Sequence, residues 1–150
     1  MADLSIDKDP HFQVRGIPDE VKMNQLQSLI HDALIGTGHV SQCAILKRKD
    51  GLIRASSVGF QLSNEQTQMI INAFKNPAAT REEGLYYDDN QYKCVRSDKN
   101  SIYSKCGSKG LILVRTHTLV IAATYTTSMY PSVCVEAVER LADYFKEKGK

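Results

Sequence analysis

The stretch from residue 84 to residue 126 most constrains the fold, because it contains strand-like segments joined by very short turns. The segments are rich in Tyr, Val, Ile and Thr, and they cover residues 85–87, 92–96, 101–105, 111–116 and 119–126. Clusters of Asp, Asn, Ser, Lys and Gly separate most of them. Connections this short join antiparallel neighbours, because a parallel pair needs a long crossover. We therefore expect an antiparallel sheet.

Two of these segments, residues 111–114 and 119–123, are apolar at every position. Successive side chains of a strand point to opposite faces, so such a strand must be covered on both sides. Earlier in the chain, residues 43–46 and 52–56 form a further pair of expected strands around a Lys-Asp-Gly turn. The sheet should therefore have helices on both faces.

Three segments show the apolar period of helices that bury one face. Their expected bounds are residues 24–35, 63–76 and 133–148. Gly36 ends the first, as glycine does at a helix C-terminus. Ser63 and Gln66 form a capping box for the second, and the Asn-Pro pair at residues 76–77 stops it. Each helix can thus cover the sheet with one apolar face.

The order of elements predicts an α+β fold. An antiparallel sheet of about five to seven strands should be sandwiched between the N- and C-terminal helices and a middle helix. Residues 23–150 form the expected domain. Residues 1–22 mix charges with Pro and Gly and show no period, so we expect a flexible N-terminal extension. A docking arm through Phe12, Val14 and Ile17 is the alternative.

Composition excludes several classes of protein. The formal net charge is only +2 over 150 residues, which argues against nucleic-acid wrapping. The cysteines are far apart and form no C-x-x-C pair, so reduced thiols are expected and no metal or cofactor site. The first residues do not resemble a signal peptide, and no apolar stretch reaches the ~18 residues of a membrane span. We expect a cytosolic protein.

No pattern of catalytic residues emerges, and we expect no enzyme. The histidines are scattered and form no H-x-x-x-H pair: His11, His31, His39 and His117. Residues 36–38 resemble part of a phosphate loop but are not followed by G-K-[ST] and come after a helix. The acidic pairs at residues 82–83 and 88–89 lie in turns, where neighbouring carboxylates are usually solvated.

Cations are more informative than acids in this sequence. The lipid-binding candidates lie on the first hairpin and the later strands: Lys47, Arg48, Lys49, Arg54, Lys93, Arg96 and Lys105. One interpretation is a solvated rim, since charges often only solvate a face. The other is a surface that meets an acidic protein or anionic lipid headgroups.

Six short segments, in order and without large gaps over residues 24–148, resemble the profilin family. They are LIGTG at 34–38, NAFK at 72–75, GL at 84–85, YKCVRSD at 92–98, SIY at 101–103 and VERLADY at 138–144. Residues 129–137 resemble a divergent isoform of that family. The resemblance implies three activities, which are binding of monomeric actin, of proline-rich segments and of phosphoinositides.

The polyproline site of typical profilins is an aromatic cradle between the terminal helices. At its first-helix positions this chain has Leu26 and Leu29 in place of Trp and Tyr, and at its strand position it has Arg54 in place of Trp. Only Tyr144, with Leu141 beside it, matches the pattern. A polyproline II helix docks on aromatic faces, so we expect polyproline binding to be weak or lost.

The actin-binding face of the family is built from the later strands, their turns and the start of the last helix. Residues at matching positions are Arg96, Lys105, Arg115 and Thr116. Two positions depart from the family pattern. Asn100 replaces a basic residue, and Ser132 replaces the Gly of a Pro-Gly pair. A lost cation and an added side chain both predict weakened actin binding.

These observations favour a monomeric, profilin-like cytoskeletal binding protein of the cytoplasm. Its expected partners are actin, bound weakly, and anionic phospholipids, with polyproline ligands and nucleic acid not expected. The alternative is an interaction adaptor with the same fold that binds neither actin nor polyproline.

Overall fold

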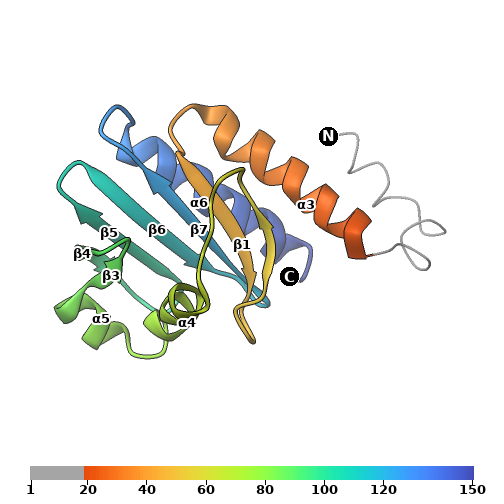
Figure 1. Cartoon of the computed structure of the whole chain (residues 1–150). Coiled ribbons are helices and arrows are strands. Elements are labelled where there is room, and N and C mark those ends of the chain that lie inside the picture. Colours follow the sequence, from red (N-terminus) through yellow and green to blue (C-terminus); the bar gives the residue numbers. More distant parts are fainter. Residues whose placement is uncertain (1–18) are drawn as a thin grey trace.

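The computed structural model describes residues 19–150, and Figure 1 shows how the helices and strands are arranged. Element labels follow that figure. In chain order the elements are α3 (Asp19–Ala33), the 3-10 helix η1 (Ile35–Thr37), β1 (Gln42–Lys47), β2 (Ile53–Ser56), α4 (Asn64–Ala73), α5 (Pro77–Glu83), β3 (Leu85–Tyr87), β4 (Asn90–Ser97), β5 (Ser101–Cys106), β6 (Lys109–Arg115), β7 (Leu119–Tyr125) and α6 (Pro131–Glu147).

The strands form one seven-stranded antiparallel sheet in the spatial order β2-β1-β7-β6-β5-β4-β3. From β3 to β7 each strand pairs with the next along the chain, as the short turns predicted. One strand pair joins segments that are far apart in the sequence. Strand β1 pairs with β7, from Gln42 opposite Thr124 to Lys47 opposite Leu119. The expected α+β class and the sheet of five to seven strands are confirmed.

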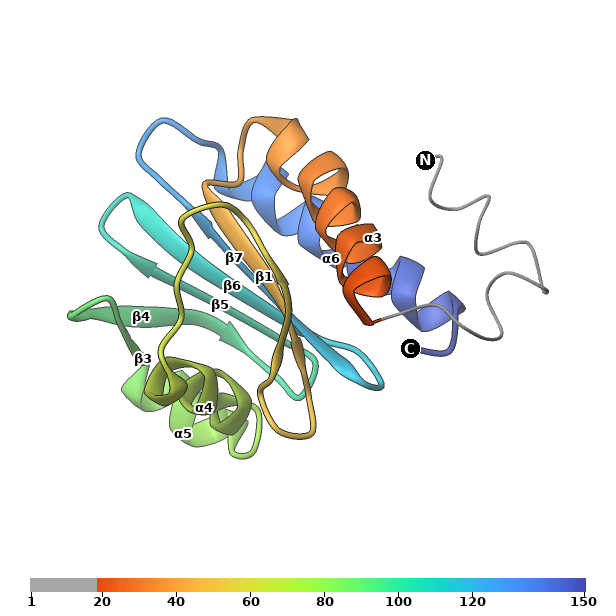
Figure 2. The same ribbon diagram turned by 45° about the vertical axis from the view of Figure 1, so that its right-hand side comes forward.

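Helices cover both faces of the sheet, as Figures 1 and 2 show: α3 and α6 lie on one face, and α4 and α5 on the other. Side chains of β6 alternate between the two layers. Ile112 and Val114 pack in the core under α3 and α6, whereas Leu111 and Leu113 pack in the core under α4. All four are buried. Each such side chain contributes about 1.5–3 kcal/mol when removed from water.

Helix α4 begins with the predicted capping box. The Ser63 hydroxyl accepts from the Gln66 N–H, and the Gln66 side-chain oxygen accepts from the Ser63 N–H, both over 3.2 Å. The sequence prediction missed α5. It treated the residue pair before and at Pro77 only as a stop, but proline is tolerated in the first turn of a helix. There the Asn76 side chain caps α5 by accepting from the Ala79 N–H over 3.1 Å.

Helix α3 differs from its expected bounds of 24–35, because it begins at Asp19 and ends at Ala33. The left-handed backbone that follows is at Gly38 (φ 80°) and not at Gly36. Residues 1–18, and with them the alternative docking arm, lie outside the described residues. The division into an extension and a domain from residue 23 stays a prediction. None of the described helices is long and apolar enough to cross a membrane.

Candidate functional site

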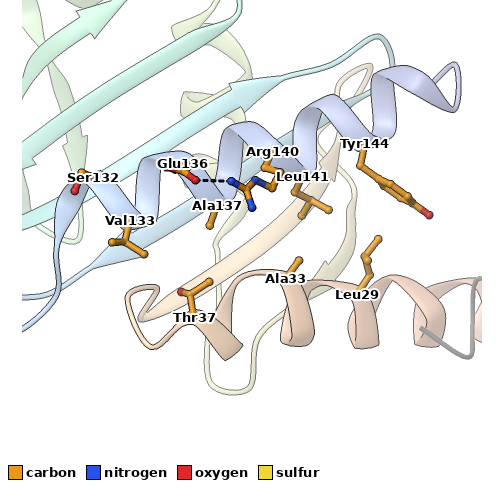
Figure 3. Close-up of a pocket in the computed structure, with 10 residues that line it drawn as sticks. All are labelled: Leu29, Ala33, Thr37, Ser132, Val133, Glu136, Ala137, Arg140, Leu141 and Tyr144. Carbon is orange, nitrogen blue, oxygen red and sulfur yellow. Dashed lines mark hydrogen bonds and ion pairs between the residues drawn. The ribbon is translucent and has the colours of Figure 1, made fainter.

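A groove of about 560 Å³ runs between α3 and α6 (Figure 3). The residues that line it come from both helices and from the turn after α3: Leu29, Ala33, Thr37, Ser132, Val133, Glu136, Ala137, Arg140, Leu141 and Tyr144. The α6 residues recur every three or four positions, so they project from one side of that helix. The volume is typical of ligand pockets, which span about 300–1,000 Å³.

Three of the predicted polyproline residues meet in this groove, namely Leu29, Leu141 and Tyr144. Leu26 is partly buried against the same core, and Arg54 does not line the groove. The sequence reasoning missed the α6 residues from Val133 to Arg140. Counting back from Tyr144 in steps of three and four would have identified them, because that spacing defines one helix face.

Half of the residues that line the groove are aliphatic, and Tyr144 is the one aromatic residue among them. The Lys148 ammonium lies 5.5 Å from the centroid of the Tyr144 ring, and the Phe145 ring meets that ring edge-on at 5.6 Å. Arg140 donates to Glu136 one helical turn earlier on the rim. This groove lining offers apolar contact, but it does not present the row of flat aromatic faces on which polyproline stacks.

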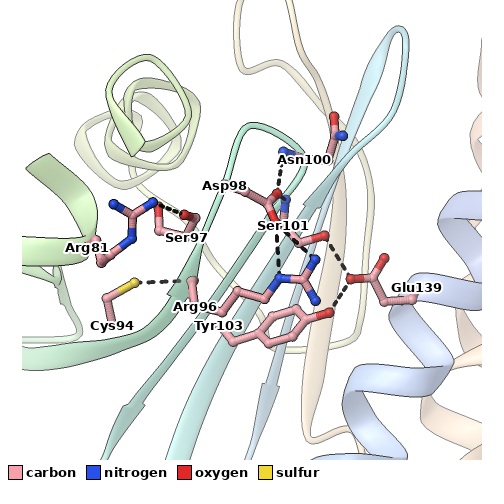
Figure 4. Close-up of polar contacts among 9 residues, drawn as sticks. All are labelled: Arg81, Cys94, Arg96, Ser97, Asp98, Asn100, Ser101, Tyr103 and Glu139. Carbon is pink, nitrogen blue, oxygen red and sulfur yellow. Dashed lines mark hydrogen bonds and ion pairs between the residues drawn. The ribbon is translucent and has the colours of Figure 1, made fainter. Parts of the chain in front are cut away.

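A polar cluster occupies the sheet beside α6 (Figure 4). Arg96 pairs with Asp98 through contacts of 2.9 and 3.0 Å, and its guanidinium lies over the Tyr103 ring at 5.3 Å. The Tyr103 hydroxyl donates to Glu139 of α6, and the Ser101 hydroxyl donates to the same carboxylate over 2.8 Å. Arg96 is therefore already engaged within the molecule.

Neighbouring charges, hydrogen bonds and burial shift the pKa values of Asp98 and Tyr103 in this cluster. Burial would raise the pKa of Asp98, but the N–H groups of Asn100 and Ser101 and the Arg96 guanidinium hold it below its usual value. Burial, followed by the neighbouring Glu139 carboxylate, raises the pKa of Tyr103 to about 12. At neutral pH, Asp98 is thus a carboxylate and Tyr103 a neutral donor.

Two further cations on this face stand directly opposite each other. Lys93 on β4 and Lys105 on β5 are register partners, and both are exposed. A bulge at Val95 follows, so that Arg96 pairs with Tyr103. No carboxylate of residues 25–150 lies within ion-pair distance of either lysine. Like charges placed opposite each other destabilise a sheet, so this pair lowers the stability of the isolated chain.

Among the remaining predicted actin residues, Asn100 lines the same surface pocket as Arg96, and the backbone N–H of Arg115 donates to the Asn100 carbonyl. Asn100 is exposed in the β4–β5 turn, and Ser132 is exposed at one end of the groove. Thr116 is buried, and its hydroxyl donates to the Lys150 carbonyl over 2.7 Å. Arg115 is half-buried, with its guanidinium 5.8 Å from the centre of the Phe74 ring. Thr116 thus makes a structural contact to Lys150, after the end of α6, and its buried side chain is not available to a partner.

The basic residues of the first hairpin differ in their contacts and exposure. Arg48 donates to the carbonyls of Thr116 and His117 over 3.2 Å each, which ties it to the β6–β7 turn. Lys49 is exposed and Lys47 half-exposed. Arg54 is the extra residue of a β-bulge, since Leu46 pairs with Ile53 and Ile45 with Ala55.

Two of the four thiols lie in the core of the protein. All four cysteines are free, and Cys43 and Cys134 are buried. Burial raises the pKa of both thiols to about 12, which keeps them protonated and unreactive. Residues 19–150 contain no group of three or more side chains that could hold a metal ion.

The two-faced sheet and the groove between its terminal helices define a profilin-type binding module. The family model of Profilin matches residues 24–150, and the chain belongs to the profilin family. Profilins are non-enzymatic binding proteins that in general bind actin and polyproline.

The match to similar proteins covers nearly their whole length. Profilin-4 of Bos taurus is 45% identical over 128 residues, which are 85% of this chain and 99% of that protein. Profilin-A of Physarum polycephalum is 36% identical over 123 residues, 82% and 97% of the two chains. The crystal structure of Acanthamoeba castellanii profilin II matches with a TM-score of 0.76 and 35% identity, over 83% and 98% of the chains.

Proposed function

We propose that this chain is a cytoskeletal binding protein of the profilin family that contacts monomeric actin weakly, binds anionic phospholipids and has little or no affinity for polyproline. It works in the cytoplasm as a monomer, without a cofactor. Membership of the profilin family supports the general role, and the particular residues of this chain support the changes in affinity.

The observation that carries the proposal is the opposed pair Lys93 and Lys105. Both lysines are exposed and have no acidic partner among residues 25–150, whose side chains the structure describes. An anionic surface relieves their mutual repulsion, whether it belongs to actin or to lipid headgroups. Each lysine near an anionic membrane contributes about 1 kcal/mol.

Weakened actin binding follows from the surroundings of this pair. Arg96 is paired with Asp98, so a partner's carboxylate has to compete for it. Asn100 provides no charge in the adjoining turn, and Ser132 adds a side chain at a close-approach point. These changes lower the attraction without abolishing the cationic surface.

The proposal is tested by co-sedimentation with vesicles that contain or omit phosphoinositide, and by titration with monomeric actin, each at low and physiological salt. Lys93→Glu with Lys105→Glu should weaken vesicle binding by about tenfold or more. Lys109→Glu, at an exposed lysine on β6, is the control. A wild-type protein that binds neither vesicles nor actin would instead support the adaptor function, in which the basic face or the N-terminal arm contacts another partner.

A further inference from the structure

The sheet ends in two edge strands, β2 and β3, and the two edges differ in how their outward backbone groups are paired. On β2, the side-chain amide of Gln27, from α3, bonds both backbone groups of Ser56. Its nitrogen donates to the Ser56 carbonyl, and its oxygen accepts from the Ser56 N–H over 3.2 Å. A neighbouring strand would make the same two hydrogen bonds, so a helix side chain closes the β2 edge at this residue.

The β3 edge is open at Tyr86. Strands β3 and β4 are joined by a two-residue turn in which Asp88 and Asp89 have φ values of 50° and 60°. Such a turn makes the residues on either side of it a hydrogen-bonded pair, so the next pair, Tyr86 and Gln91, has no hydrogen bonds. The N–H and C=O of Tyr86 thus point away from β4, and β3 is the last strand at that edge (Figures 1 and 2).

A pocket of about 230 Å³ lies beside this edge, between α4, α5 and β3, and Tyr86 is among its lining residues. Its apolar lining comes from Met69 and Ala73 of α4, Ala79 of α5 and Leu85 of β3. Leu85 packs in the core under α4, and successive side chains of a strand point to opposite faces. In a chain that pairs with Tyr86, the residues before and after the paired one would therefore point toward the pocket.

Carboxylates flank β3 on both sides. Glu82 and Glu83 precede the strand, Asp88 and Asp89 follow it, and all four are exposed. Residues 82–89 contain no cation, and none of these carboxylates forms an ion pair with residues 25–150. Two copies of this edge would repel each other, which disfavours pairing of β3 with β3 of a second copy. The charge instead favours an occupant with basic side chains.

We propose that the β3 edge and its pocket bind a basic segment of a partner protein, which adds to the sheet as an antiparallel strand. Tyr86 supplies one main-chain donor and one acceptor, and the pocket takes an apolar side chain of the segment. The flanking carboxylates pair with Lys or Arg on either side of that side chain. The open strand and the pocket define the site, and the acidic residues determine the charge of its occupant. The inference goes beyond the proposed function and rests on neither actin nor lipid binding.

The test uses the full chain and a fluorescein-labelled heptapeptide, RKVTVKR. With its threonine opposite Tyr86, both valines face the pocket and the cations reach the flanking carboxylates. One control peptide, DEVTVED, reverses the charges. Another is RKVTVKR with an N-methyl group on the threonine amide, which keeps the charge but cannot donate to the Tyr86 carbonyl. Fluorescence anisotropy measures the affinities at low and physiological salt, and hydrogen exchange of the Tyr86 amide reports strand addition.

Three variants separate the parts of the site. Glu83→Gln with Asp88→Asn removes one carboxylate on each side of β3, and Asn tolerates the positive φ at residue 88. Asp143→Asn with Glu147→Gln is the matched control, because it removes the same charge at exposed positions of α6. Ala79→Leu reduces the pocket without changing the charge.

The wild type should bind RKVTVKR in preference to both control peptides, and the bound peptide should slow exchange of the Tyr86 amide. The double variant at β3 and Ala79→Leu should each weaken binding about tenfold, whereas the double variant on α6 should change little. Equal losses for the two double variants, or equal affinity for the N-methylated peptide, would indicate attraction by net charge alone and overturn the inference. Absence of peptide binding at low salt, or unchanged binding by Ala79→Leu, would overturn it as well.

Discussion

The hydroxyl of Tyr103, on β5, donates to the carboxylate of Glu139, on α6, and so joins the sheet to the last helix. Ser101 donates to the same carboxylate oxygen. Arg96 lies over the Tyr103 ring, and α6 lines the groove on its other side. The junction therefore connects the cationic face of the sheet with the helix that forms the groove.

Replacing Tyr103 with Phe should lower the free energy of unfolding by about 1 kcal/mol at neutral pH, the usual value of one hydrogen bond. The folded-state pKa of Tyr103 is raised from 10.0 to about 12, so its stabilising contribution is complete below pH 10 and is lost as pH rises toward 12. The difference between wild type and Tyr103→Phe should therefore shrink over that range. Denaturant unfolding at a series of pH values measures it.

Tyr86→Phe is the control for removal of a tyrosine hydroxyl, because Tyr86 is 61% exposed. It should leave the unfolding free energy nearly unchanged at neutral pH. A wild-type advantage over Tyr103→Phe that stays constant up to pH 12 would contradict the assigned hydrogen bond.

Gly110 on β6 is packed against its register partner on β7, Tyr125. A Cβ added at Gly110 would overlap the ring and hydroxyl of Tyr125. Gly110→Ala should therefore cost about 1–3 kcal/mol of stability through overpacking. In a Tyr125→Ala background the same change should cost much less, which a double-mutant cycle measures. Additive effects of the two substitutions would show that the ring does not limit residue 110.

Most of the fold was accessible from local patterns. The capping box at Ser63 and the strands from residue 84 onward depend on neighbouring residues, and the structure confirms them. Helix α5 was missed because the residue pair at 76–77 serves equally as a stop and as a start. The pairing of β1 with β7 was not predicted, because nothing in a local apolar run specifies a partner about 80 residues away.

The candidate sites were less accessible for the same reason. The resemblance to profilins identified Leu29, Leu141 and Tyr144, and the structure brings them together. Arg54 is the extra residue of a bulge, where the direction of a side chain differs from that in a regular strand, and it does not line the groove. The hydrogen bonds from Arg48 to the carbonyls of Thr116 and His117 join two hairpin ends that meet only in the folded chain.

Deletion of residues 1–18 should leave the thermal midpoint nearly unchanged, because this stretch has no apolar period in the sequence. Deletion of residues 1–22 removes the first turn of α3 as well and should lower the midpoint by several degrees. Calorimetry of both variants beside the full chain distinguishes the two effects. A large drop for the shorter deletion would mean that the segment packs as structure, with Phe12, Val14 and Ile17 the first residues to examine.

Oligoproline should bind this chain only weakly, with a dissociation constant far above the micromolar range, because the groove contains one aromatic side chain. Leu26→Trp with Leu29→Tyr adds aromatic faces on α3 and should raise the affinity by about tenfold or more. Val58→Trp, at a position that is 95% exposed and outside the groove, is the matched control. A low-micromolar dissociation constant for the wild type, or no gain from the double substitution, would refute this view of the groove.

Asn100→Arg should strengthen actin binding and make it more sensitive to salt. The backbone of Asn100 is engaged, since its N–H donates to Asp98 over 2.8 Å and its carbonyl accepts from Arg115. Its side chain is exposed, so an arginine fits there without loss of these contacts. One added cation facing an acidic surface should raise the affinity about fivefold at low salt, with the gain reduced at physiological salt. Titration of monomeric actin with the wild type, Asn100→Arg and Val58→Arg measures the effect, the last variant adding the same charge elsewhere. Equal gains for both arginine variants would indicate net charge alone, and no detectable complex with any of the three would favour the adaptor function.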